Sequence, residues 1–87
     1  MPVLRISREE PIERVVGVTL DVARVYFKAS EELFVPFAHN NTQAWKFTSN
    51  QPDMECVMVM LTKKNIQIQG SSRFLDFFGL HSKIDGV

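Results

Sequence analysis

The single cysteine of the chain, Cys56, is the residue with the greatest potential for nucleophilic chemistry. Such chemistry requires a thiolate, which a neighbouring base or positive charge must stabilise. Cys56 instead opens a run of six apolar residues, C-V-M-V-M-L, and shares the parity of Met58 and Met60. Because burial in apolar surroundings disfavours a thiolate, the pattern predicts that Cys56 belongs to the hydrophobic core.

Two histidines and two carboxylates are the other candidates for acid–base or metal chemistry. His39 and His81 are far apart in the sequence, and neither has a neighbour at the spacing of a zinc ligand, so we expect no metal site. Asp53 and Glu55 are two residues apart beside a predicted turn, where solvated carboxylates are the simplest interpretation. An enzyme with its site at a dimer interface, around His39 and Asp53, is the third-ranked hypothesis.

Motifs that bind phosphates or activate a serine are absent from the sequence. The four glycines are scattered, and none of the patterns G-x-x-x-x-G-K, G-x-G-x-x-G and G-x-S-x-G occurs. We therefore expect a noncatalytic protein without a cofactor.

A second candidate site consists of basic residues that could contact the phosphates of a nucleic acid, with Trp45 available to stack on a base. These basic residues are Lys46, Lys63, Lys64 and Arg73. The predicted order of a helix, three strands and a helix over residues 8–80 resembles the double-stranded-RNA-binding domain, which implies RNA as a ligand. That family has a lysine-rich start to its second helix, whereas the matching residues here are Ser71-Ser72-Arg73-Phe74.

A third candidate site is the aromatic segment from Ser71 to Phe78. It resembles the short box by which proteins dock on sliding clamps, with Phe74, Phe77 and Phe78 at the hydrophobic positions and Ser71 in place of the glutamine. Phenylalanines three and four residues apart on a helix are also typical of the stripe that packs a helix on a sheet. The sequence favours this second interpretation.

A long amphipathic helix over residues 8–34 is the largest predicted element. Polar residues recur there every three or four positions for about six turns, as expected on one face of a helix. Ser7 and Glu10 form a capping-box pattern at its start, and Val35-Pro36 should end it. Its apolar face is wide, including Val18 and Val25, and a single sheet would cover it incompletely.

The strands are predicted from alternating or continuous apolar residues. Besides a short strand at 3–7, we expect a half-buried strand at 44–49 and a hairpin whose strands begin at Cys56 and Ile66. Ile66 and Ile68 alternate with glutamines, which indicates an outer strand. A short helix should follow at 73–80, and residues 81–87 should form a loose tail.

These elements predict an α+β fold in which a long helix packs on an antiparallel sheet of three or four strands, with a short C-terminal helix. A small all-β barrel or sandwich, with strands within residues 14–37, is the alternative. At 87 residues, with 45% hydrophobic and 23% charged residues, the chain should form one domain over 1–87. The lack of a long apolar segment at its start predicts a cytoplasmic protein.

The leading functional hypothesis is a small regulatory or interaction module that acts as a homodimer or binds a larger protein. Ten basic and ten acidic residues leave no net charge, which disfavours nucleic acid as a partner and protects the chain poorly from self-association. The expected contact surface is the apolar helix face or the outer strand. Its predicted residues are Val18, Val25, Ile66, Ile68, Phe74, Phe77 and Phe78.

Overall fold

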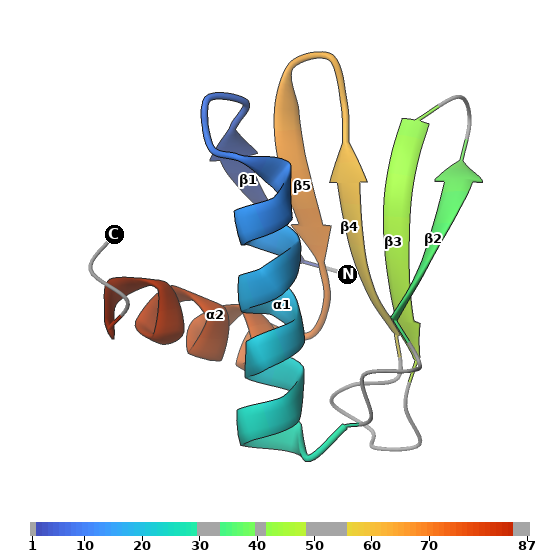
Figure 1. Cartoon of the computed structure of the whole chain (residues 1–87). Coiled ribbons are helices and arrows are strands. Elements are labelled where there is room, and N and C mark those ends of the chain that lie inside the picture. Colours follow the sequence, from blue (N-terminus) through green and yellow to red (C-terminus); the bar gives the residue numbers. More distant parts are fainter. Residues whose placement is uncertain (1, 30–33, 40–41, 49–55, 85–87) are drawn as a thin grey trace.

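A computed structural model describes residues 2–29, 34–39, 42–48 and 56–84, with the backbone alone for residues 34–39, 48 and 82–84. The chain runs through one strand, a helix, four strands and a second helix (Figure 1). In order, these elements are β1 (Val3–Ser7), α1 (Ile12–Phe27), β2 (Phe34–His39), β3 (Thr42–Thr48), β4 (Cys56–Leu61), β5 (Asn65–Gln69) and α2 (Ser72–Ile84).

The five strands form one antiparallel sheet in the order β1-β5-β4-β3-β2. The first strand pairs with the last, with Leu4 opposite Ile68 and Ile6 opposite Ile66. Helix α1 therefore connects the two edges of the sheet, and it lies across the face on which α2 also packs (Figure 1).

The predicted α+β fold is confirmed, and the all-β alternative is excluded because residues 12–27 form a helix. The sheet has five strands, one more than the upper expectation, because β2 occupies residues for which the sequence pattern predicts the helix end and a loop. Ile66 and Ile68 do not form an outer strand: β5 lies between β1 and β4. The edges are β1 and β2, so the alternation of isoleucine and glutamine reflects two different faces of an interior strand.

Helix α1 is shorter than predicted at both ends. Its N-cap is Pro11 without a side-chain cap, so the predicted capping box does not form; Ser7 instead accepts hydrogen bonds from the backbone N–H groups of Glu9 and Glu10. The helix ends after Phe27, where Lys28 takes a left-handed conformation with φ 57°. That conformation redirects the chain toward β2 eight positions before the expected stop at Pro36.

The core lies between the two helices and one face of the sheet. Alternate residues of the central strands, including Val57, Val59, Ile66 and Ile68, are fully buried there. Helix α1 contributes buried valines, and Thr19 is buried with its hydroxyl donating to the Val15 carbonyl at 2.8 Å. We call the face of the sheet that packs against the helices its inner face.

The opposite, outer face of the sheet carries the residues that alternate with the core positions. Cys56, Met58 and Met60 lie there and are half-buried. The prediction that Cys56 belongs to the core is therefore wrong. A run of six apolar residues is typical of a strand covered on both faces, whereas both helices pack on one face of this sheet.

Helix α2 is held to α1 by stacked and tilted aromatic rings. Tyr26 and Phe77 stack with ring centroids 4.4 Å apart, and Phe27 lies 5.8 Å from Phe74. The backbone N–H of Phe74 donates to the Ser71 hydroxyl, so Ser71 caps the start of α2. The helix continues to Ile84, so residues 81–84 are not a loose tail; residues 85–87 lie outside the described part of the chain.

Candidate functional site

Among the pockets formed by described residues are two on the helix side of the sheet, one on each flank of α1. The first lies between α1 and β3 and has a volume of about 360 Å³. We call it the α1–β3 groove, and it is lined by Ile12, Glu13, Val16, Gly17, Gln43 and Trp45.

The apolar part of the α1–β3 groove is built by one helix turn facing one strand. Ile12 and Val16 are four residues apart and therefore lie on the same face of α1. Trp45 pairs with Val59 in the β3–β4 register, which places it on the inner face, toward the helix. All three side chains are half-buried and pack against the edge of the core.

Gly17 leaves a gap in the wall of the α1–β3 groove. A Cβ atom at this position would meet no other atom within 4 Å, so packing within the chain does not require glycine. Glycine in the middle of a helix costs about 1 kcal/mol relative to alanine. The helix therefore carries a destabilising residue at the place where a partner could approach its backbone most closely.

The polar residues of the α1–β3 groove are Glu13 and Gln43, and both are exposed. Glu13 is the only charged residue among the six that line the groove. The site thus combines a large aromatic side chain, two aliphatic side chains and one carboxylate at its rim. This composition suits binding of an apolar group that carries a nearby positive charge.

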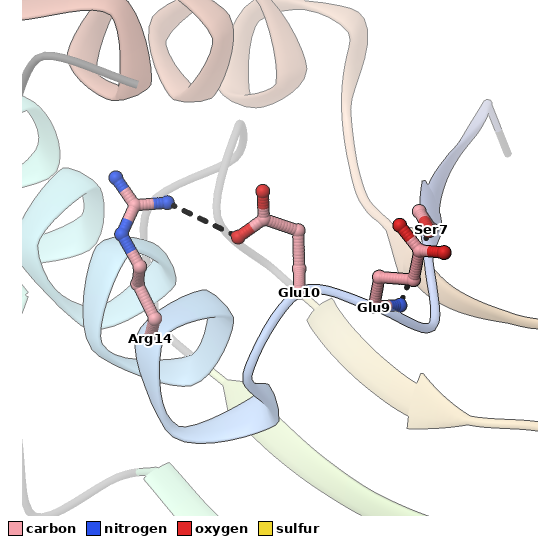
Figure 2. A network of polar contacts seen from close by, with 4 residues as sticks. All are labelled: Ser7, Glu9, Glu10 and Arg14. Atoms are coloured by element: carbon pink, nitrogen blue, oxygen red, sulfur yellow. Dashed lines mark hydrogen bonds and ion pairs between the residues drawn. The ribbon is translucent and has the colours of Figure 1, made fainter.

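The second pocket lies between β1, α1 and α2 and has a volume of about 210 Å³. We call it the three-element pocket, and it is lined by Leu4, Ile6, Glu10, Arg14, Val15, Val18, Phe78 and Gly79. Its walls are apolar except for Glu10 and Arg14, which form an ion pair with 3.6 Å between Oε2 and Nη1. Figure 2 shows Arg14 reaching from the first turns of α1 toward Glu10, with Glu9 beside Ser7.

Most of the predicted partner-binding residues lie in the core. Ile66, Ile68 and Phe74 are fully buried, and Val18 and Phe78 are at least 93% buried. Their apolar pattern arises because they pack the helices on the sheet, so they offer no surface to a partner. Val25 is 54% exposed and Phe77 is half-buried beneath Tyr26, and their role in partner binding stays a prediction.

The predicted nucleic-acid residues do not converge on one surface. Lys63 and Lys64 are exposed in the turn between β4 and β5, where the Arg8 guanidinium donates to the Thr62 carbonyl. Lys46 alternates with Trp45 and Phe47 and therefore lies on the outer face of the sheet.

Arg73 lies at the start of α2, 5.5 Å from the centroid of the Phe27 ring and 5.6 Å from that of Phe77. This position follows the C-terminal end of β5, whereas the two lysines precede the N-terminal end of that strand. A single phosphate backbone would therefore have to follow three separate surfaces.

Of the residues considered for catalysis, the structure describes the side chains of Cys56, on the outer face of the sheet, and of His81, on α2. His81 lies near Asp21, with 3.9 Å between Nε2 and Oδ2, and its ring meets Tyr26 edge-on. No three histidine, cysteine, aspartate or glutamate side chains gather in a metal-binding arrangement within the described residues. The His39 side chain, Asp53 and Glu55 lie outside what the structure describes.

The α1–β3 groove was missed at the level of sequence, although its signals are present. Ile12 and Val16 followed by Gly17 give apolar residues at helical spacing beside a helix-interior glycine. Trp45 was considered only as a base-stacking residue. Its proximity to α1 depends on the strand order, which places β3 next to β4 rather than at an isolated edge.

Comparison with known proteins finds no matching family model, no similar curated protein and no similar solved structure. Neither helix of the described structure has the length and apolar character that crossing a membrane would require. The geometry of the two described pockets is therefore the evidence for function.

Proposed function

We propose that this chain is a noncatalytic interaction module that binds an apolar segment of a larger protein in the α1–β3 groove. The observation that carries the proposal is the combination of Trp45 with the gap at Gly17 in one groove. Tryptophan is among the residues that most often dominate binding energy at protein interfaces, above all when a pocket surrounds it.

The groove supports a particular kind of partner. A side chain such as leucine or phenylalanine can insert between Ile12, Val16 and Trp45, while Gly17 allows the partner backbone to approach α1. Glu13 favours a lysine or arginine next to the inserted side chain. The proposed ligand is thus an amphipathic segment with apolar anchors and a basic rim.

The helix side of the sheet supports this assignment more strongly than the outer face does. The inserted group would contact residues that the core already holds in place, because Ile12, Val16 and Trp45 pack against it. Such a preorganised pocket loses little conformational freedom on binding. The outer face offers half-buried methionines, which carry no charge to orient a partner.

A capture experiment with matched variants tests the proposal. Tagged wild-type chain, Gly17→Leu, Trp45→Ala and Gly79→Leu are incubated with native lysate after nuclease treatment, and retained proteins are quantified by mass spectrometry. Gly17→Leu fills the α1–β3 groove, whereas Gly79→Leu introduces the same change in a helix that does not border it. We expect one partner to be retained by wild type and Gly79→Leu and reduced at least tenfold by the two groove variants.

Retention of every protein to equal extents by wild type and Gly17→Leu would overturn the proposal. Light scattering on the purified chain tests the alternative occupant of the groove, which is a second copy of the same chain. If the wild-type chain is a dimer and Gly17→Leu is a monomer, the groove binds a second copy of the chain and not a larger protein. If the wild-type chain is a monomer, self-association through this groove is excluded. Circular dichroism of each variant establishes that the loss of binding does not come from unfolding.

A further inference from the structure

The three-element pocket is a separate cavity whose walls are almost entirely apolar. Leu4 and Ile6 come from β1, Val15 and Val18 from α1, and Phe78 from α2. The pocket is partly open to solvent, and its volume of about 210 Å³ has room for a small apolar group.

Gly79 extends the pocket on the side of α2. A Cβ atom at Gly79 would meet nothing within 4 Å, although the residue lies in the interior of the helix. As with Gly17, a residue that weakens its helix lines an open space rather than a close contact. Packing within the described chain therefore gives no reason for a glycine here, whereas a ligand in the pocket would.

The charged rim of the pocket indicates which head group a ligand would carry. Arg14 and Glu10 are 35% and 37% exposed, which places both where the pocket meets solvent. Their separation of 3.6 Å is longer than a charge-assisted hydrogen bond of about 2.8 Å. A planar guanidinium has five N–H donors, so Arg14 can bind a carboxylate with two parallel hydrogen bonds in place of this loose contact.

The start of α1 adds a further preference for an anion over a cation. Arg14 lies in the first turns of the helix, where the aligned peptide dipoles place partial positive charge. Pro11, at the N-cap, provides no side-chain cap to satisfy the first N–H groups. Glu10 is the one opposing charge among the lining residues.

We propose that the three-element pocket binds a small apolar carboxylic acid, with its hydrocarbon part between β1, α1 and α2 and its carboxylate on Arg14. Glu10 then acts as a competing internal anion that the ligand displaces. This site is independent of the α1–β3 groove, because no residue lines both.

A matched series of six-carbon ligands tests the head group. Hexanoate, hexanol and hexylamine are titrated into the full chain, and binding is followed by two-dimensional NMR and calorimetry. We expect hexanoate to bind with shifts at the resonances of Ile6, Val18 and Phe78, and hexanol to bind about tenfold more weakly. Equal binding of hexanoate and hexanol, tighter binding of hexylamine, or no binding at millimolar concentration would overturn the proposal.

Two variants at the rim give opposite expected results. Arg14→Gln should weaken hexanoate binding about tenfold, whereas Glu10→Gln should strengthen it by removing the competing carboxylate. Both side chains are more than one-third exposed, so neither change should prevent folding. A Glu10→Gln variant that binds hexanoate more weakly than wild type would contradict the assigned roles.

Two further variants locate the ligand. Gly79→Leu should abolish hexanoate binding by filling the cavity, and Gly17→Leu should leave it unchanged. These are the variants whose expected effects on protein capture are reversed, so failure of one proposal is distinguishable from failure of the other. Hexanoate that still binds Gly79→Leu with wild-type affinity would exclude this pocket as its site.

Discussion

Replacement of Gly17 by alanine should make the protein more stable and a weaker binder. Gly17 is the sixth residue of α1 and lies in its interior, and a Cβ atom there would touch nothing within 4 Å. Alanine is favoured over glycine in a helix interior by about 0.8–1.0 kcal/mol. Because the added methyl group creates no overpacking, we expect almost the whole of this gain in the free energy of unfolding.

The expected stabilisation is large enough to measure. For a domain of 87 residues, 1 kcal/mol corresponds to a rise in Tm of about 4–8 °C. Urea unfolding followed by circular dichroism should show a higher midpoint with an unchanged slope. Gly70 provides a contrast: a Cβ atom there would lie 3.4 Å from Val57 and 3.5 Å from Phe74, outside any helix, so Gly70→Ala should bring no comparable gain.

A fall in the midpoint for Gly17→Ala would refute the reasoning, since it would mean that another part of the chain already occupies the α1–β3 groove. A rise in stability together with unchanged partner binding would refute its functional part. The expected combination, higher stability with weaker binding, is the pattern of a residue retained for function at the expense of stability.

Substitutions at three further positions test the packing and the end of α1. Phe74→Ala should lower the free energy of unfolding by about 3–5 kcal/mol in urea titrations, because its ring is fully buried against Phe27; a loss below about 1 kcal/mol would contradict this core. Lys28→Gly should raise the free energy of unfolding by about 0.5–1 kcal/mol because it removes the left-handed strain at φ 57°, whereas the control Lys28→Ala should not raise it. Equal effects of the two substitutions would contradict a strained Lys28. Thr19→Val should change the free energy of unfolding by less than about 1 kcal/mol, since the Thr19 hydroxyl only adds a bond to a carbonyl of its own helix. Thr19→Ala should lower the free energy of unfolding more, because Thr19 is buried and the smaller side chain leaves a cavity. Calorimetric unfolding in which Thr19→Val is the more destabilising of the two would refute this expectation.

The fold class was predictable from the sequence because periodicity is a property of short segments. The polar stripe of α1 and the hairpin of β4 and β5 both follow local rules, and both are confirmed. The helix end was not predictable in the same way. Lys28 ends α1 in a conformation that glycine or asparagine usually adopts, so the sequence carries no clear signal there.

The order of the strands, and the face of the sheet on which each residue lies, were harder to predict than the strands themselves. The glutamines of β5 suggested an edge strand, but the pairing of β1 with β5 makes it an interior strand with one buried face. That pairing joins segments about sixty residues apart, and no local pattern encodes it. The same long-range contact explains why Cys56 is half-buried: nothing in its own strand indicates that both helices lie on the other side.

The candidate sites depended on tertiary structure even more strongly. Phe74, Phe78 and Ile66 have the composition of a binding surface, yet their apolar character serves the core. The residues that line the α1–β3 groove come from two segments whose proximity depends on the order of the strands. Gly17, beside Ile12 and Val16, could have been noticed beforehand as a glycine without an evident reason inside a long helix.

Photo-crosslinking from the α1–β3 groove tests the central claim most directly. The photoreactive residue p-benzoylphenylalanine replaces Val16, which lines the groove, or Asp76, which is exposed on α2, and crosslinked proteins are identified after irradiation in lysate. We expect one protein to be crosslinked from position 16 and not from position 76, and the crosslink to be lost when Gly17→Leu is added. Crosslinking of the same proteins from both positions, or a crosslink that survives Gly17→Leu, would contradict binding in the groove.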